Sequence, residues 1–117
     1  MWQRYFKPHL RTIIDTCRRA NPELAIFWHS DGNIEPIIPD LIDAGVKILN
    51  PVQVSARDMD TRRLKAEFGE RLSFMGAIDT QQVLPFGTEE DVKAEVERRV
   101  ADLGPGGGYI LAPVHNI

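Results

Sequence analysis

Apolar positions along the chain alternate between two patterns, one typical of helices and one typical of buried strands. The first set recurs at helical spacing and predicts an amphipathic helix with one apolar face; its members are Phe6, Leu10, Ile13, Ile14 and Cys17. The segment "ANPE" interrupts this pattern, and the apolar run "LAIFW" that follows predicts a buried strand. A helix followed by a strand is therefore the first structural unit.

The same unit recurs twice in the middle of the chain. Residues 37–42 repeat the helical spacing, Gly45 stands where a helix C-cap belongs, and "VKILNPV" follows as a second strand. A third helix ends at Gly69 and precedes "LSFMGAI", a continuous apolar run typical of a strand that is buried on both faces.

A fourth unit completes the series. Thr88 and Asp91 have the spacing of a capping box and predict a helix start. The residues expected to face inward from this helix are Val92, Val96, Val100 and Leu103. The segment "GPGGG" then leads into the strand "YILAPV". Because these glycines lie between a helix and a strand, they predict a tight reversal, whereas a phosphate-binding loop lies between a strand and a helix.

Four helices alternating with four strands predict an α/β fold with a parallel sheet and right-handed crossovers. A complete (β/α)8 barrel takes about 250 residues, so four units correspond to half of a TIM barrel. The chain begins just before the first helix and ends just after the fourth strand. We therefore expect residues 1–117 to be a single partial domain, a half-barrel whose other half is missing and whose free sheet edges require a partner, such as a second copy in a homodimer.

Composition agrees with one globular domain and excludes several classes of partner. With 43% hydrophobic residues and a net charge of -3, the chain can bury a modest core and lacks the basic surface that nucleic acid or an anionic membrane would require. Cys17 is the only cysteine, so no internal disulfide can form. We expect a soluble cytoplasmic protein without membrane segments.

Polar side chains collect after the predicted strands and are rare before them. These residues are His29, Asp31, Asn50, Gln53, Asp79, Gln81 and His115. In parallel α/β folds the carboxyl ends of the strands form the active-site face. We therefore expect these seven side chains to face one mouth.

Each candidate also has a simpler structural interpretation. His29 and Asp31 could ligate a metal, or form only a hydrogen-bonded pair at a strand end. Asp79 could bind substrate or cap the following turn. Asn50 and Gln53 could orient a substrate carboxylate or amide, but Asn50 could also do no more than shape the turn before Pro51.

The segments "HSDG", "NPVQ" and "FMGAIDTQQVLPFGTEEDVKAEVERRVADLGPGGGYILAPVHNI" together resemble the C-terminal half of the uroporphyrinogen decarboxylase superfamily. The resemblance covers nearly the whole chain and implies a (β/α)8 barrel. The superfamily contains cofactor-independent decarboxylases of tetrapyrrole acetate groups. It also contains zinc-dependent methyltransferases that act with corrinoid proteins and thiols.

The two branches of the superfamily differ at the candidate residues. In the methyltransferases, the strand that corresponds to "LAIFWHSDG" of this chain typically ends in His-x-Cys-Gly. A second Cys stands at the position of His115, and the histidine and the two cysteines bind zinc. This chain has His29, Asp31 and His115 instead, a harder set that suits zinc, manganese or iron. The decarboxylases share Asp31 and Gly32 but lack a counterpart of His29, and their catalytic histidine aligns with His115.

The resemblance implies a primary function and a second alternative. The first is a uroporphyrinogen decarboxylase-like carboxy-lyase that needs no cofactor, in which His115 and Asp31 are catalytic and Asn50, Gln53, Asp79 and Gln81 bind the tetrapyrrole. The second is a methyltransferase in which His29, Asp31 and His115 hold zinc or another divalent metal, with a thiol substrate and a corrinoid protein as partner. A third expectation is a catalytically silent fragment that self-associates through its sheet edges.

Overall fold

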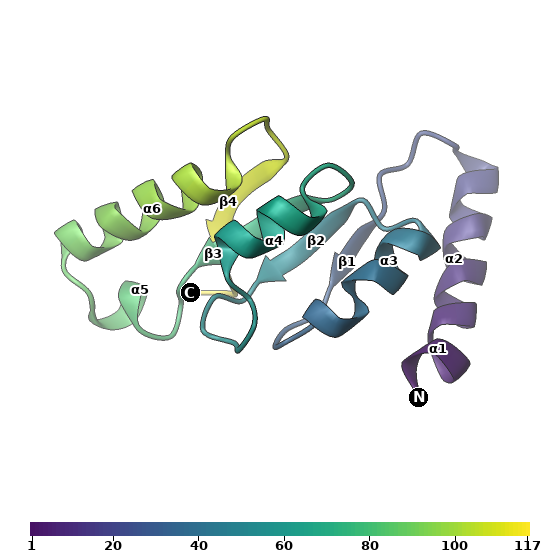
Figure 1. The fold of residues 1–117 in the computed structure, drawn as a ribbon, viewed down its shortest axis with the longest axis horizontal. Helices are drawn as coiled ribbons and strands as arrows, with labels where there is room; N and C mark the ends of the chain where they lie inside the picture. Colours follow the sequence, from purple (N-terminus) through teal and green to yellow (C-terminus); the bar gives the residue numbers. More distant parts are fainter.

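The computed structural model describes residues 1–117 as a four-stranded parallel sheet with strand order β1-β2-β3-β4 (Figure 1). The strands are β1 (Phe27–His29), β2 (Ile48–Val52), β3 (Ser73–Ile78) and β4 (Tyr109–Pro113). The helices are α1 (Trp2–Tyr5), α2 (Lys7–Ala20), α3 (Ile38–Ala44), α4 (Thr61–Phe68), α5 (Val83–Phe86) and α6 (Glu89–Leu103), with a 3-10 turn η1 at Glu35–Ile37. The predicted α/β fold of parallel strands alternating with helices is confirmed, and it is consistent with part of a TIM barrel.

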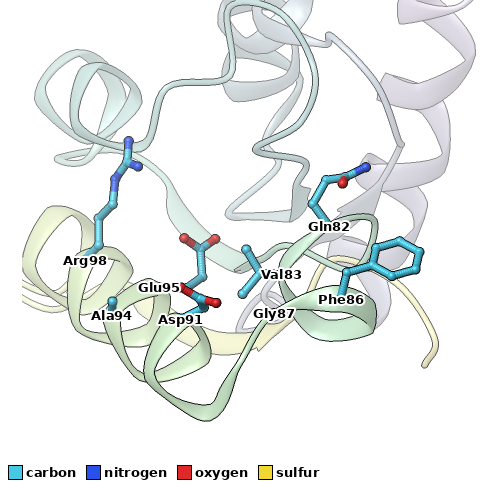
Figure 2. A pocket seen from close by; sticks show the side chains of 8 residues that line it. All are labelled: Gln82, Val83, Phe86, Gly87, Asp91, Ala94, Glu95 and Arg98. Atoms are coloured by element: carbon cyan, nitrogen blue, oxygen red, sulfur yellow. The ribbon is translucent and has the colours of Figure 1, made fainter.

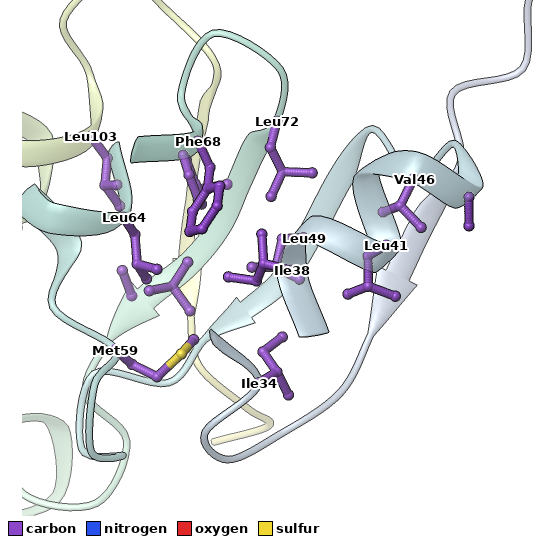
Figure 3. Packing of buried hydrophobic residues seen from close by; sticks show 14 of the residues in the cluster. Ile34, Ile38, Leu41, Val46, Leu49, Met59, Leu64, Phe68, Leu72 and Leu103 are labelled. Atoms are coloured by element: carbon purple, nitrogen blue, oxygen red, sulfur yellow. The ribbon is translucent and has the colours of Figure 1, made fainter. Parts of the chain in front are cut away.

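The hydrophobic core lies between the sheet and the helices (Figure 3). Leu49 of β2 and Phe74 of β3 are fully buried, as are Leu41 of α3 and Leu64 of α4. Side chains alternate between the two faces of a strand. The helix layer covers one face of the sheet, and the residues that alternate with the core residues lie on the other face, among them the polar Asn50 and the apolar Met75.

The predicted helix boundaries depend on local capping. Gly45 ends α3 in the left-handed region at φ 107°, and the capping box of Thr88 and Asp91 opens α6 as predicted. The side chain of Asp60 caps α4 by accepting a hydrogen bond from the backbone of Arg63 at 2.8 Å. These caps satisfy backbone groups that a helix end otherwise leaves unpaired.

A buried polar network joins α4 to α6. Thr61 donates to Asp102 at 2.6 Å and accepts from Arg99 at 3.1 Å, and Arg99 also pairs with Glu95 at 3.0 Å. Burial opposes ionisation of Asp102, but the hydrogen bonds from Thr61 and Arg62 outweigh it and lower the pKa of that carboxyl group. The charges are paired, so the helices can pack here through polar side chains.

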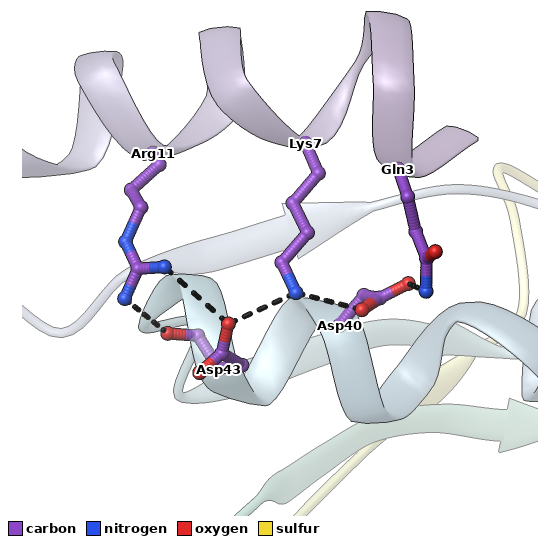
Figure 4. A network of polar contacts seen from close by, with 5 residues as sticks. All are labelled: Gln3, Lys7, Arg11, Asp40 and Asp43. Atoms are coloured by element: carbon purple, nitrogen blue, oxygen red, sulfur yellow. Dashed lines mark hydrogen bonds and ion pairs between the residues drawn. The ribbon is translucent and has the colours of Figure 1, made fainter. Parts of the chain in front are cut away.

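An ion-pair network joins α1 and α2 to α3 (Figure 4). Lys7 contacts Asp40 at 2.7 Å and Asp43 at 2.9 Å, and Arg11 adds a longer contact to Asp43. The hydrogen bond from Lys7 is the main cause that lowers the pKa values of both carboxyl groups. This network fixes the angle at which the N-terminal helix lies against α3.

Three predicted inward positions are wrong, and all lie on or beside the two outer helices. Phe6, the N-cap of α2, is 56% exposed, Ile13 of α2 is 61% exposed and Val100 of α6 is 47% exposed. The polar Glu95 and Arg99 of α6 are buried instead. Helix α2 contacts α3 and the four-residue α1, and α6 contacts α4 and the four-residue α5, so each of these outer helices has a long neighbouring helix on one side only. The apolar flank on the other side therefore has nothing to pack against.

The sheet is also open at both edges and on its inner face. Trp28 and Tyr109 pack against the core, so their neighbours Phe27 and Ile110 point to the opposite face, where they are 48% and 44% exposed. The exposed surface is 7214 Å², whereas a folded monomer of this mass exposes about 6400 Å². The excess is of the order that a standard protein interface buries on each partner. None of the helices combines the length and apolar character that crossing a bilayer demands.

The difference between the buried centre of the sheet and its exposed outer strand β4 predicts unequal effects of two leucine truncations. Leu49→Ala removes a fully buried side chain and should lower the free energy of unfolding by about 2–5 kcal/mol. Leu111→Ala, at a site 48% exposed on β4, should lower it by less than about 1 kcal/mol. Urea denaturation followed by circular dichroism measures both, and equal losses would contradict the assignment of the core.

The free edges predict self-association of the 117-residue chain. Because β1 and β4 each leave one edge unpaired, we expect the mass measured by sedimentation to rise with concentration above that of one chain. A monomer at all concentrations, with slowly exchanging amides along β1 and β4, would show that these edges need no partner.

Candidate functional site

Three of the predicted residues meet at the carboxyl ends of the strands. One ligand atom from each of His29, Asp31 and His115 lies within 4.8 Å of the others, and all three residues are exposed. His29 ends β1, and Asp31 follows in the turn at Gly32. His115 follows β4, where Val114 donates a backbone hydrogen bond to Ile78 at 2.9 Å and directs the chain across the strand ends. The rings of the two histidines are 6.2 Å apart between centroids, although β1 and β4 are the outer strands of the sheet.

The protonation of His29 follows from its contact with Asn50. Nδ1 of His29 lies 2.6 Å from Oδ1 of Asn50. An amide oxygen can only accept, so Nδ1 carries the proton and Nε2 keeps its lone pair. The lone pair of Nε2 is then available to a cation.

The nearest charged group to this lone pair is the carboxylate of Asp31. Oδ2 of Asp31 lies 3.6 Å from Nε2 of His29. With the proton of the neutral ring on Nδ1, two acceptor atoms face each other across this distance. Such a pair gains stability when a proton or a metal ion is held between the two acceptor atoms.

His115 has the opposite arrangement. Its Nδ1 accepts a hydrogen bond from the backbone N–H of Asn116 at 2.8 Å. In the neutral ring Nδ1 therefore holds the lone pair, and Nε2 carries the proton as a donor. His115 can ligate a metal through Nδ1 once the backbone hydrogen bond is released, or through Nε2 once the proton is lost.

The other four predicted site residues are placed differently from one another. Asn50 lies in the same cavity as both histidines, and Gln53 accepts a hydrogen bond from the backbone of Gly32 at 2.7 Å. Oδ1 of Asp79 accepts from the backbones of Gln81 and Gln82, at 2.7 and 3.2 Å, and so caps the turn that leads into α5. Gln81 is exposed and joins this turn through its backbone.

The cavity beside the histidines has a volume of about 510 Å³. Its lining is His29, Asn50, Met75, Ala112, Pro113, Val114, His115, Asn116 and Ile117. Met75 and Asn116 were not predicted as site residues. Met75 lies within an apolar strand, and only its alternation with the buried Phe74 indicates that it faces the cavity.

The three candidate ligands fit a divalent metal after small side-chain movements. Ligands held about 2.1 Å from a tetrahedral ion lie about 3.4 Å from one another, so the present spread has to contract by roughly an ångström. The side chain of Asp31 is 50% exposed and has room to rotate toward the His29 ring, which Asn50 holds in place. The donor set of two imidazoles and a carboxylate leaves a fourth position open, as catalytic metal sites do.

A second hollow lies between α5 and α6 and has a volume of about 370 Å³ (Figure 2). Asp91, Glu95 and Arg98 of α6 line it together with Gln82 and Val83. It contains none of the predicted site residues. The candidate ligands and Asn50 lie instead in the cavity at the ends of β1, β2 and β4.

Comparison with known proteins identifies the family. Searches of curated proteins and of solved structures each found no match. A family model described as "Uroporphyrinogen decarboxylase (URO-D)" matches residues 1–117, the full length of the sequence. The match agrees with the parallel α/β fold and with the resemblance of the strand-end segments, and the chain belongs to the uroporphyrinogen decarboxylase family.

Proposed function

We propose that this member of the family is a metal-dependent enzyme in which His29, Asp31 and His115 hold a divalent cation and a thiol is activated for methyl transfer. The observation that supports this proposal is the convergence of the three ligand atoms within 4.8 Å at the active-site rim. The thiol substrate, and a corrinoid protein as the methyl donor, are inferred from the resemblance to the methyltransferase branch.

Electrostatics favours a cation at this position. The lone pair of His29 and the carboxylate of Asp31 face each other at 3.6 Å, and no lysine or arginine is among the residues that line the cavity. A divalent ion between them would replace this repulsion with two favourable contacts. Imidazole and carboxylate ligands suit zinc, manganese or iron. The methyltransferase branch has two cysteine ligands, and a site without thiolates binds the harder ions manganese and iron better than such a site does.

The roles of the protein groups follow from their positions. His29 and Asp31 offer adjacent ligands from one turn, and His115 approaches from the opposite edge of the sheet. A bound metal supplies Lewis acidity that lowers the pKa of a thiol. Met75 and Val114 provide an apolar wall on one side of the ligands.

Metal content provides the direct test. The purified protein should bind about one equivalent of zinc or manganese, measured by elemental analysis and by titration of the metal-free form. His29→Ala and His115→Ala should each weaken binding by at least tenfold, because each removes one of three protein ligands. His9→Ala, on the exposed face of α2, is the matched histidine control and should bind like the wild type.

A protein without stoichiometric metal, or equal affinity in wild type and both site variants, would contradict the proposed site. Loss of metal in His9→Ala as well would indicate adventitious surface binding.

A decarboxylase-like function is the second candidate, and one observation favours it. Nδ1 of His115 is occupied by the backbone of Asn116, so Nε2–H is the outward donor of this ring. Such a donor suits a substrate carboxylate, as expected for a tetrapyrrole acetate group, and needs no cofactor. Asp31 would then carry the catalytic charge, and Asn50 and Gln53 would contact the substrate.

Ligand binding in the presence of chelator separates the two candidates. If the decarboxylase-like function holds, metal-free protein should bind an acetate-bearing tetrapyrrole, and His115→Ala should weaken binding by about 10–100-fold through loss of a charged hydrogen bond. Fluorescence titration measures the affinity, with His9→Ala as control. If the metal-free protein does not bind the tetrapyrrole but the protein takes up one equivalent of metal, the decarboxylase-like function is excluded and the metal-dependent function is supported.

A further inference from the structure

The two motifs at the ends of β1 and β2 are joined by side-chain hydrogen bonds. The register of the sheet pairs His29 with Asn50, and the backbone of Ser30 donates to the carbonyl of Asn50 at 2.9 Å. Gln53, three residues further along, reaches back to the backbone of Gly32. The segment "NPVQ" therefore contacts "HSDG" on both sides of Asp31.

Asn50 has the position and burial of a supporting residue. It is only 8% exposed, and its Oδ1 lies 2.6 Å from Nδ1 of His29. A short contact from a side chain that is itself held by the β-ladder leaves the imidazole little freedom to rotate. Because the acceptor is an amide oxygen, the contact also determines which ring nitrogen carries the proton.

His115 shows that this control is specific to His29. The backbone of Asn116 donates to Nδ1 of His115, so the two rings hold their protons on opposite nitrogens. In its neutral form, His29 therefore has an unprotonated Nε2 that faces Asp31. Nε2 of the neutral His115 ring carries a proton and would have to lose it before binding a cation. Without Asn50 the carboxylate of Asp31, 3.6 Å from Nε2, would favour the ring form with its proton on Nε2.

Gln53 supports the second ligand in a comparable way. Its Oε1 accepts the backbone N–H of Gly32 at 2.7 Å, and Gly32 has φ 83° in the left-handed region. This bond fixes the turn that directly follows Asp31. The direction of the Asp31 carboxylate thus depends on a side chain from the neighbouring strand end.

We infer that Asn50 and Gln53 are positioning residues: Asn50 holds His29 with its proton on Nδ1 and its Nε2 lone pair toward Asp31, and Gln53 holds the turn that presents Asp31. This assignment replaces direct substrate contact as the role of both residues. Its effect on metal affinity rests on the proposed metal site, whereas its effect on the proton of His29 does not.

Nitrogen NMR of the metal-free protein tests the role of Asn50. In wild type at a pH where the rings are neutral, the ¹⁵N shifts of His29 should show Nδ1 protonated and Nε2 unprotonated. Asn50→Leu should give a mixture of the two forms, and Asn50→Asp, which keeps an acceptor, should restore the wild-type form. Gln82→Leu, an exposed amide in the separate hollow between α5 and α6, is the matched amide-to-leucine control and should leave the His29 signals unchanged.

Zinc titration of the same variants tests the consequence. Asn50→Leu should raise the dissociation constant by about 10–100-fold, as loss of a ligand-orienting hydrogen bond does elsewhere. Gln53→Leu should raise it by about tenfold while the ¹⁵N pattern of His29 stays that of wild type. Asn50→Asp and Gln82→Leu should bind within about threefold of wild type, and matching urea midpoints should show that all variants are folded.

The outcomes separate this inference from the metal proposal. If wild type binds no zinc, the metal site fails, but a mixed ring in Asn50→Leu with rescue in Asn50→Asp still supports the positioning of His29. An unchanged His29 pattern in a folded Asn50→Leu would overturn the role of Asn50. Unchanged zinc affinity in Gln53→Leu would overturn the role of Gln53. If Asn50→Leu does not fold, a wild-type NMR spectrum with Nε2 of His29 protonated would by itself overturn the role of Asn50.

Discussion

The common direction of the four strands is the constraint on which the rest of this structure depends. Because all strands are parallel, their carboxyl ends lie at one rim, and residues far apart in sequence reach one place there. His29 and His115 are separated by most of the chain yet have rings 6.2 Å apart. The same constraint requires a crossover between successive strands, and the helices in these crossovers collect on one face of the sheet (Figure 1).

The sequence predicts the repeating units well because their signals are local. Helical spacing, the Gly45 cap and the Thr88–Asp91 box each depend on residues within a few positions, and the structure confirms them. The inward positions of Ile13 and Val100 were wrong because their exposure depends on whether another helix lies beside them, which spacing cannot reveal. The short helices α1 and α5 were also missed, since each consists of four residues, too few to establish a periodic pattern.

The candidate site was predictable in composition but not in its bonding. Strand-end position selected seven candidates, and the family resemblance singled out His29, Asp31 and His115 among them as possible ligands. The ligand atoms of these three lie within 4.8 Å of one another, whereas Asp79 caps a separate turn. The bond between Asn50 and His29 depends on strand register, and the bond from Asn116 to His115 depends on how the last residues turn. Neither is encoded in a residue pattern, yet the two bonds determine which ring accepts and which donates.

The division of the molecule into two faces also separates stability from chemistry. The side chains that contribute most buried apolar area, such as Leu49 and Phe74, lie under the helices, whereas the candidate ligands lie at the rim and are half exposed. Burying two acceptors such as His29 and Asp31 without a proton or metal would be costly, and their exposure reduces that cost through water. An exposed site, however, loses the rigidity that packing provides. Short hydrogen bonds from Asn50 and Gln53 can supply that rigidity, since both residues belong to the segment at the end of β2, the strand paired with β1.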